Sequence, residues 1–395
     1  MKLFVIIVFI LLPGIATSQQ LLKGSGGELL LRPADAVVFE EGSTRSDLAC
    51  AVTPVKPKLE LDFLFHAGFQ VSIPLEGLEE GVSDLTVLFR VVSQDHPGDP
   101  VYLFQRLKVP ARARAEHKSS FEFDGLFRVG EGKYHVDWMM RDNGDHVCAN
   151  SWDIEAKLSS REAPLRAWIG TGFVKPAQAE LFSEEAPVPR KTEGASVDVI
   201  VNFAPREPGS AALDESDLRG VLAILRQIAR DPNIGSYSLV ACSIPEHKVL
   251  HRQEKEPQID FPAIREALKL LKLGVVDARD LALRESHSVF IADVVRKLSA
   301  SSRSDALILV GPRMAPESAD VHEISEVLKD MGRPVFYLSY DSDPLASPWR
   351  DMLGNAARHA RGTEYEITTP RDLFGAWSEI IHRIITSKRT GVTGP

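Results

Sequence analysis

Polar side chains that could do chemistry follow the apolar runs of the second half of the chain. The runs are "VDVIV", "DALILV" and "VFYLSY", and a fourth segment, "RESHSVF", brings two serines and a histidine together. The residues of interest are Asn202, Arg206, Ser286, His287, Ser288, Arg313, Asp341 and Asp343. Carboxylate, amide and hydroxyl oxygens are ligands for hard divalent cations, whereas serine, histidine and aspartate together can hydrolyse acyl bonds. The sequence thus raises two chemistries, cation binding and hydrolysis.

Hydrolysis would need a nucleophile, Ser286 or Ser288, a base, His287, and an orienting carboxylate from Asp341 or Asp343. The Gly-x-Ser-x-Gly turn that exposes such a serine is missing, and adjacent serine and histidine side chains rarely point at each other. We therefore keep an extracytoplasmic hydrolase with a Ser/His site as the alternative and not as the main expectation.

The segment "YDSDP" could offer Asp341 and Asp343 to calcium. The same letters are typical of a turn that ends a strand, because aspartate and serine side chains bond to their own backbone and proline fixes φ. We expect the turn. The chain has no phosphate-binding loop or dinucleotide fingerprint, so the sequence predicts no cofactor.

From residue 194 to 389, strand-like and helix-like periods alternate. Strands are predicted at 197–203, 237–243, 306–310, 335–340 and 364–367, with amphipathic helices between them. Alternation of this kind predicts an α/β unit, a doubly wound and mostly parallel sheet with helices on both faces. Ligands of such sheets bind beyond the carboxyl ends of the strands, which is where the polar residues would gather.

The order of these elements resembles the von Willebrand factor A domain of some secreted bacterial proteins. The resemblance rests on a first strand leading into a long helix ("VDVIVNFAPREPGSAALDESDLRGVLAILRQIA"), a helix pair, and "DALILVGPRM" before another helix. It implies a metal motif, Asp-x-Ser-x-Ser with a later Thr and Asp. Carried onto this chain, the motif falls on Asn202, Ala204, Arg206, Ser286 or Ser288, and Gly311 or Pro312.

These replacements remove the strong metal ligands that the resemblance implies. An amide, a methyl group and a guanidinium cannot replace a carboxylate and two hydroxyls, and Arg206 would repel a cation. We expect a degenerate metal site that binds no metal. The candidate binding edge comprises Asn202, Ala204, Arg206, Ser286, Ser288, Gly311, Arg313, Asp341 and Asp343.

Residues 28–158 consist of short β-branched and aromatic runs, among them "DAVVFEE", separated by Gly, Pro and Asp. They predict an all-β sandwich that resembles an immunoglobulin-like module. The clearest hairpin turns at Asn143-Gly144, a pair that accepts positive φ. Trp138 shares a face with Tyr134 and Val136, which favours core packing over a sugar-binding platform. Residues 159–193 have the composition of a linker with one or two short ordered pieces, and 390–395 form a tail.

Three cysteines, Cys50, Cys148 and Cys242, are too few for a disulfide scaffold. Cys50 and Cys148 both lie in the β-rich half, so they are the pair to expect if one bridge exists, with Cα atoms within about 7 Å. Three inert buried thiols are an equal alternative, because cysteine is among the most buried residue types.

The N-terminus has one lysine, an apolar run from Leu3 to Leu12 and the small-residue triplet Ala16-Thr17-Ser18. This pattern predicts a signal peptide over 1–18 with cleavage near Ser18, and the run is shorter than the ~20 residues of a membrane span. The protein is expected to be secreted or periplasmic. Its formal charge of −9 becomes −10 without Lys2, which disfavours nucleic acid and anionic membranes as partners.

These observations favour a secreted, non-enzymatic binding or scaffold protein with a protein partner. Arg206 and Arg313 are the side chains that we expect to meet an acidic surface of that partner.

Overall fold

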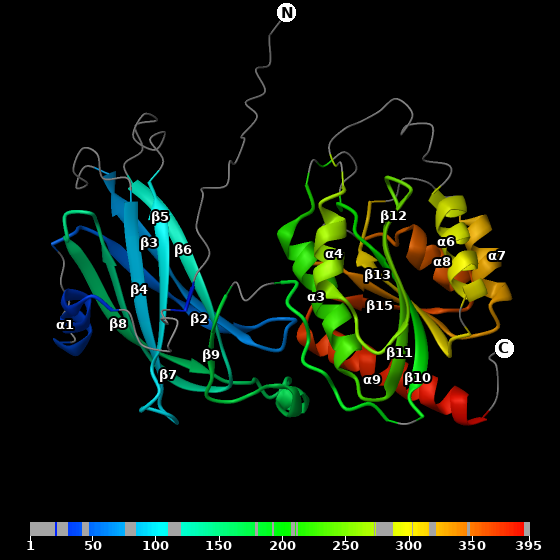
Figure 1. Cartoon of the computed structure of the whole chain (residues 1–395), viewed down its shortest axis with the longest axis horizontal. Coiled ribbons are helices and arrows are strands. Elements are labelled where there is room, and N and C mark those ends of the chain that lie inside the picture. The colour runs from blue at the N-terminus through cyan, green and yellow to red at the C-terminus, as the bar shows by residue number, and fades with distance from the viewer. Residues whose placement is uncertain are drawn as a thin grey trace, which may run out of the picture. The chain divides into compact units, whose positions relative to one another are not determined.

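The computed structural model describes residues 20–21, 31–41, 47–75, 84–109, 120–177, 181–191, 193–206, 210, 212–271, 273, 287–301, 303–315, 321–345 and 348–390. The chain forms two compact units, Met1–Ala179 and Glu180–Pro395 (Figure 1). The predicted signal peptide, Ser286 and the tail 391–395 lie outside the described residues. No helix among the described residues is long and apolar enough to cross a bilayer.

Two antiparallel sheets build the first unit. Their strands are β1 (Gln20–Leu21), β2 (Ala51–Leu59), β3 (Phe65–Pro74), β4 (Asp84–Ser93), β5 (Val101–Lys108), β6 (Ser120–Val129), β7 (Gly132–Arg141), β8 (Val147–Ala156) and β9 (Val174–Pro176). The five-stranded sheet has the order β1-β5-β4-β7-β8, and the four-stranded sheet has the order β2-β3-β6-β9.

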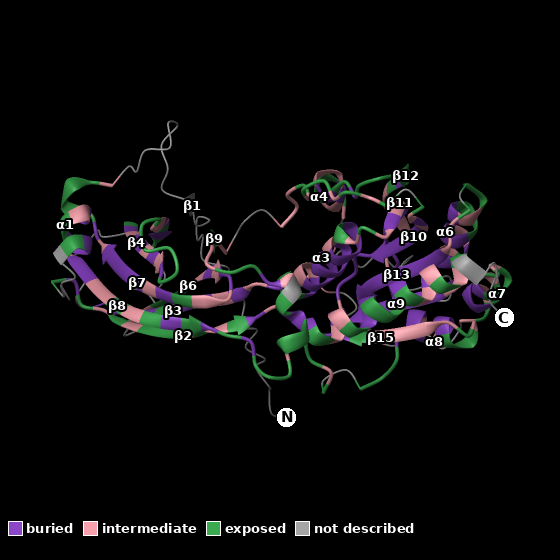
Figure 2. Ribbon diagram, turned by 90° about the horizontal axis from the view of Figure 1, so that it is seen from below, coloured by how far each residue is buried: buried purple, intermediate pink, exposed green. Residues whose placement is uncertain are grey.

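Aromatic rings from both sheets form the core between them. The ring of Phe69 on β3 lies 5.4 Å from that of Phe89 on β4 and 5.5 Å from that of Trp138 on β7. Phe89 in turn lies 5.5 Å from Phe127 on β6. Trp138 is only 1% exposed, so it is a core residue, as the alternation of β7 predicts, and cannot serve as a sugar platform. Figure 2 shows the buried residues along these strands.

The segment "DAVVFEE", predicted as a strand, is instead part of helix α1 (Pro33–Glu41). Val38 and Phe39 of this helix are buried against Leu88, Met139 and Val147 on the outer face of the five-stranded sheet. The prediction was wrong because β-branched residues favour strands only weakly, and burial of a helical face against a sheet outweighs that preference.

The loop between β7 and β8 turns by a mechanism other than the predicted one. The positive φ lies at Asp145, at 60°, and not at Asn143 or Gly144. The Asp142 carboxylate accepts bonds from the backbone N–H of Gly144 at 2.8 Å and of His146 at 2.9 Å, so a side chain organises the five-residue loop.

Cys50 and Cys148 form a disulfide with their Cα atoms 6.2 Å apart. Cys50 directly precedes β2 and Cys148 lies on β8, so the bridge connects the two sheets. Cys242 is buried as a free thiol on β11, and burial raises its pKa to about 12.

Much of the segment predicted as a linker, 159–193, is tied to one unit or the other. A 3-10 helix, η2 (Ala163–Trp168), precedes β9, which pairs with β6 and so belongs to the first unit. Beyond residue 180, Arg226 binds the Glu185 carboxylate and the carbonyls of Leu181 and Ser183. The polar composition of this segment suggested a linker, because attachment through arginine hydrogen bonds requires little burial of apolar side chains.

The second unit is a mixed α/β structure around a six-stranded sheet. Its strands are β10 (Ala195–Asn202), β11 (Ile234–Ser243), β12 (Lys248–Glu256), β13 (Ala306–Pro312), β14 (Val335–Tyr340) and β15 (Thr363–Ile367), in the order β12-β11-β10-β13-β14-β15. All neighbours pair in parallel except β11 and β12. The five predicted strands are confirmed. The edge strand β12 was missed because "KVLHRQEKE" has little apolar alternation.

Helices cover both faces of this sheet. They are α3 (Glu215–Arg230), α4 (Phe261–Leu268), α6 (His287–Ser301), α7 (His322–Asp330), α8 (Met352–His359) and α9 (Pro370–Thr390). Tyr337 packs in one cluster with residues of α6, α7 and α8, whereas the ring of its neighbour Phe336 lies 5.1 Å from the guanidinium of Arg383 on α9. Successive strand residues face opposite sides, so the two helix groups lie on opposite faces.

Candidate functional site

The carboxyl ends of β10, β13 and β14 meet at one edge of the second unit. A Cβ added to Gly311 would lie 3.2 Å from Cβ of Asn202, and the backbone N–H of Ala315 donates to the carbonyl of Arg206 at 3.1 Å. Asp341 follows β14 and joins the same edge through Arg206. The order of the strands reverses between β10 and β13, which is where open α/β sheets bind ligands.

The guanidinium of Arg206 lies at the centre of this edge. It donates to Asp217 in the first turn of α3 at 2.6 Å, to Asp341 at 2.8 Å and to the Ser342 hydroxyl at 2.9 Å. Asp341 is fully buried and Asp217 is 4% exposed. A single cation therefore bridges two buried carboxylates, one from the first turn of α3 and one from the loop after β14.

The electrostatics of this bridge favour a charged arginine. Burial lowers the pKa of Arg206, but the hydrogen bond to Asp217 and the attraction of Asp341 raise it further, above its usual value. Burial raises the pKa of Asp217, and the bond from Arg206 only partly offsets that rise. The positive charge of Arg206 thus stabilises the ionised form of Asp217 against the cost of burial.

The side chain of Asn202, at the first position of the expected metal motif, already has protein partners. The Asn202 side-chain oxygen accepts the backbone N–H of Ile244 at 3.0 Å, and its amide nitrogen contacts the Met314 sulfur at 3.3 Å. Ala204 is buried and offers a methyl group. Within the described part of the chain, no group of three or more His, Cys, Asp or Glu residues is arranged to hold a metal ion.

The "YDSDP" segment has the geometry of a turn at the end of β14. The Asp341 carboxylate accepts the backbone N–H of Asp343 at 3.0 Å while it also binds Arg206. Asp341 is buried, whereas Asp343 is exposed. The two carboxylates therefore differ in environment, and the buried one, Asp341, pairs with the guanidinium groups of Arg206 and Arg313.

The serine and histidine of α6 contact other groups than a triad would require. The Ser288 hydroxyl is 2% exposed and accepts the backbone N–H of Ile324 at 3.2 Å. Nδ1 of His287 lies 2.6 Å from Nε2 of His247, and the His247 ring stacks on Phe290. These contacts fasten α6 to α7 and to the β11–β12 turn. Ser286, the other candidate nucleophile, is not among the described residues.

Arg313, directly after β13, is the second arginine at this edge of the sheet. It is 6% exposed, and its Nη2 lies 3.0 Å from Glu366 and 3.8 Å from Glu364, while Nη1 lies 3.7 Å from Asp341. Burial lowers the pKa of Arg313, but the hydrogen bond to Glu366 and the charges of Asp341 and Glu364 raise it more. Arg206 and Arg313 therefore share Asp341 as a counter-ion.

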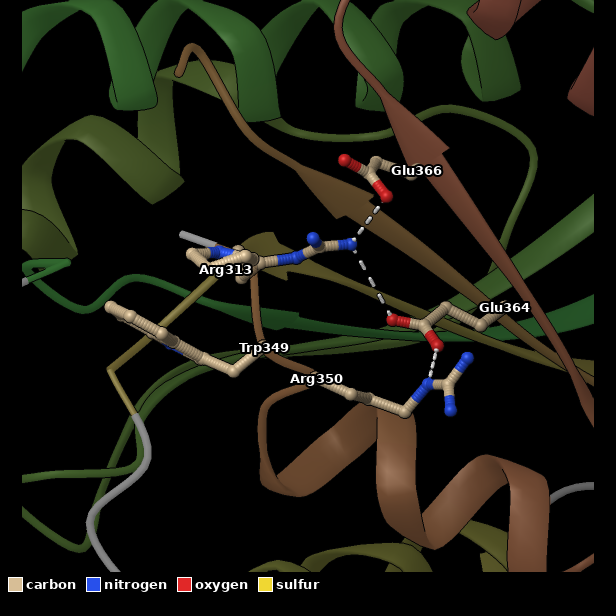
Figure 3. Close-up of a pocket in the computed structure, with 6 residues that line it drawn as sticks. Arg313, Trp349, Arg350, Glu364 and Glu366 are labelled. Carbon is tan, nitrogen blue, oxygen red and sulfur yellow. Dashed lines mark hydrogen bonds and ion pairs between the residues drawn. The ribbon is translucent and has the colours of Figure 1, made fainter. Parts of the chain in front are cut away.

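A cavity of about 310 Å³ opens beside Arg313. Its lining residues are Arg313, Pro348, Trp349, Arg350, Glu364 and Glu366 (Figure 3). Asp351 fixes one wall, because its carboxylate caps α8 through Gly354 N–H at 2.8 Å and accepts the Tyr337 hydroxyl at 2.7 Å. Burial raises the pKa of Asp351, which the Gly354 and Tyr337 bonds partly offset.

The structure thus brings together most of the residues that the sequence nominated, but not all. Asn202, Ala204, Arg206, Gly311, Arg313, Asp341 and Asp343 belong to the loops and strand ends of this edge. The Ser288 hydroxyl instead accepts the backbone N–H of Ile324, in the first turn of α7.

Sequence reasoning missed Asp217, Glu364, Glu366, Trp349 and Arg350. Asp217 looks like an ordinary acidic residue in a first helical turn, and Glu364 and Glu366 look like alternating polar residues on an edge strand. The one usable signal was the polar "TEYE" pattern at the end of an otherwise apolar parallel sheet.

Comparisons with known proteins add no family to this picture. No family model matches the chain, and no curated protein matches it. Among solved structures, Northeast Structural Genomics Consortium target SoR45 is similar over 30% of this chain and 95% of its own, with 9% identity and a TM-score of 0.19. A glycosyl hydrolase family 2 member from Bacteroides cellulosilyticus DSM 14838 is similar over 81% of this chain, with 10% identity and a TM-score of 0.18.

A further glycosyl hydrolase family 2 structure from Bacteroides cellulosilyticus is similar over 81% of this chain, with 12% identity and a TM-score of 0.19. This chain covers 45% and 43% of the two hydrolase chains, which is less than half of each. At such TM-scores these likenesses carry no functional argument, so the function has to be argued from the edge itself.

Proposed function

We propose that the protein is a secreted, non-enzymatic protein-binding or scaffold protein. Its second unit is a von Willebrand A-like domain in which an arginine has replaced the metal ion. The observation that carries this proposal is the Arg206 guanidinium, bound at 2.6 Å by Asp217 and at 2.8 Å by Asp341 at the carboxyl edge of the sheet. The guanidinium supplies positive charge to both carboxylates and occupies the space between them, which disfavours a divalent ion at this position.

The strand order supports the von Willebrand A-like assignment. Numbered by position in the chain, the six strands run 3-2-1-4-5-6 across the sheet, with the long helix α3 following the first strand. For the first unit, two facing antiparallel sheets connected by a disulfide support the immunoglobulin-like assignment.

The disulfide also supports export. Such bonds form and persist in oxidising compartments and are rare in the cytosol. Together with the N-terminal pattern of residues 1–18, the Cys50–Cys148 bridge favours a secreted or periplasmic protein. Sequencing the N-terminus of exported protein tests this, and we expect it to begin at Gln19.

Exposed apolar side chains on the loop between β14 and α8, part of which lines the cavity, support a protein partner. Leu345 is 93% exposed and Trp349 is 39% exposed, and both lie on the loop between β14 and α8. Tryptophan and arginine dominate the binding energy of many protein interfaces, and both are present here. A large apolar side chain on the rim of a polar cavity is typical of an anchor for another protein.

A capture experiment with the full exported chain tests the function. The bait is incubated with the extracytoplasmic fraction of its source cells, cross-linked, and compared with Leu345→Ser and with Val249→Ser, a matched exposed position on β12. We expect a partner that is captured by the wild type and by Val249→Ser but lost with Leu345→Ser. A partner retained by Leu345→Ser would refute this edge as the binding surface.

The hydrolase alternative makes a different prediction. It requires hydrolytic activity in the exported protein that Ser288→Ala or His287→Ala abolishes while the melting temperature stays unchanged. Because the Ser288 hydroxyl is buried and bonded to Ile324 N–H, we expect Ser288→Ala to alter stability and not activity.

A further inference from the structure

The cavity beside Arg313 contains more negative than positive charge once its buried surroundings are counted. Arg313 and Arg350 face Glu364 and Glu366 across it, and Asp341 lies behind Arg313. Adding the Arg206–Asp217 pair gives three arginines against four carboxylates, Asp217, Asp341, Glu364 and Glu366. The edge as a whole therefore attracts cations more than anions.

Both arginines of the cavity wall are engaged by carboxylates. Figure 3 shows the Arg313 guanidinium reaching toward Glu366 and Glu364, with Arg350 meeting Glu364 from the other side. An anionic ligand would have to compete with these carboxylates and would face their repulsion. These carboxylates favour a basic partner over the acidic one that the sequence led us to expect at Arg206 and Arg313.

Two buried oxygens at this site have no hydrogen-bond donor. Oε1 of Glu364 and Oδ2 of Asp341 are inaccessible to solvent and lack a hydrogen bond, and the Arg313 nitrogens that pair with them lie 3.8 Å and 3.7 Å away. A buried acceptor without a donor is costly, and native structures leave few of them. Both groups are acceptors, and Glu364 also lines the cavity, so a ligand that pairs with its carboxylate must be a donor.

An aromatic wall completes a site for a cation. The indole of Trp349 lines the cavity and is 39% exposed, and tryptophan is the aromatic side chain that attracts cations most strongly through its ring face. Glu366, at 43% side-chain exposure, places a carboxylate within reach of solvent at the same cavity. A carboxylate beside an accessible indole suits a guanidinium or an ammonium group.

We propose that this cavity receives an arginine or lysine side chain of the protein partner, held against Trp349 and paired with Glu366 and Glu364. The proposal rests on the proposed function, because Leu345, on the same β14–α8 loop as Trp349, is taken to contact the same partner. It names the chemistry that recognises the partner, a basic side chain next to an apolar one.

Direct binding tests the proposal without the partner. The full exported chain is titrated with N-acetyl-arginine amide and N-acetyl-lysine amide, with N-acetyl-citrulline amide as the neutral match for arginine, and binding is followed by calorimetry or saturation-transfer NMR. We expect the two cations to bind and the citrulline derivative to bind about tenfold more weakly. Binding should weaken as salt rises.

Two variants locate the binding. Glu366→Gln keeps the shape of the side chain and removes its charge, and Trp349→Leu removes the aromatic ring. Each substitution should lower the affinity for N-acetyl-arginine amide by about tenfold. Glu326→Gln, an exposed carboxylate on α7 paired with Lys329, is the control and should leave binding unchanged. Thermal melts confirm that each variant is folded. Equal binding by Glu366→Gln and the wild type overturns the proposal, as does binding of N-acetyl-glutamate amide or methyl glucoside in place of the cations.

Competition in the capture experiment separates this proposal from the proposed function. We expect the arginine amide, but not the citrulline amide, to displace the captured partner, and Glu366→Gln to capture less of it. If Leu345→Ser loses the partner while Glu366→Gln retains it fully, the binding surface stands and the cationic recognition fails. If neither variant loses the partner, the binding surface itself is refuted.

Discussion

The two ends of the six-stranded sheet use the same pair of groups, a guanidinium and a buried aspartate, with different results. At the amino end, Arg333 donates to Asp198 at 2.7 Å and to the Ser299 hydroxyl at 3.0 Å, and it also binds Ser304. Asp198 is fully buried and the Arg333 side chain is 11% exposed. This end is a closed, well-bonded pair.

The carboxyl end is larger and incompletely bonded. There Arg206 and Arg313 share Asp341, two carboxylate oxygens lack hydrogen bonds, and a cavity of about 310 Å³ opens beside them. A closed pair contributes to the stability of the fold, whereas a network with unmet acceptors beside a cavity has the features of a binding site. The amino end therefore has the features of a structural charge pair, and the carboxyl end those of the proposed binding site.

The largest expected effect is at the amino end. Asp198→Ala leaves the Arg333 guanidinium buried without its carboxylate, which should lower the free energy of unfolding by about 3–5 kcal/mol. Urea denaturation followed by circular dichroism measures it. Asp293→Ala, which breaks an exposed pair with Lys297, is the control and should cost less than about 1 kcal/mol. Similar losses in both variants would show that the Asp198 pair is not a structural element.

Arg206→Met tests the centre of the carboxyl end. It leaves Asp217 and Asp341 buried without their shared cation, so the free energy of unfolding at pH 7 should fall by about 2–4 kcal/mol. This loss should depend on pH. The folded-state pKa of Asp217 is already raised by burial, and removal of Arg206 raises it further, so the penalty is present above that pKa and disappears as pH falls through it.

Denaturation of the wild type and Arg206→Met between pH 7 and pH 4 measures this dependence. The two curves should approach each other on the acid side. A stability difference that grows as pH falls would contradict the assignment of Arg206 as the counter-ion of these carboxylates.

A third prediction concerns cations at the same place. Millimolar Mg²⁺, Mn²⁺ or Ca²⁺ should leave the melting temperature of the wild type within about 1 °C of its value with a chelator, because the Arg206 guanidinium already occupies the position between the two aspartates. In Arg206→Met, Ca²⁺ should raise it by a few degrees, since two carboxylates then face an empty position. A large shift in the wild type would show that this edge remains a metal site.

The smallest expected effect is at the rim of the cavity. Arg350→Gln removes a 38% exposed guanidinium paired with Glu364, and it should change the free energy of unfolding by less than about 1 kcal/mol. The same denaturation measurement checks it. A loss as large as that of Asp198→Ala would mean that the rim is part of the structural framework, and the contrast between the two ends would fail.

The sequence predicted the second unit well because its elements carry strong local signals. The apolar strands and the amphipathic stripe of α3 are signals that can be recognised in the local sequence without any tertiary contact. Signals were weak for β12 and ambiguous for α1, whose states depend on pairing with β11 and on burial against β4 and β7. β12 was missed and α1 was misassigned for this reason.

The sequence by itself determined which groups follow the strands, and hence that the expected metal ligands at Asn202, Ala204 and Arg206 are absent. It also determined that Cys50 and Cys148 lie in the same half of the chain. Only the tertiary structure decided that Arg206 spans 135 residues to reach Asp341, and that Trp349, Glu364 and Glu366 line one cavity. The physical reason is that local sequence sets backbone state and polarity, whereas the partner of a buried charge is set by which loops the sheet order brings together.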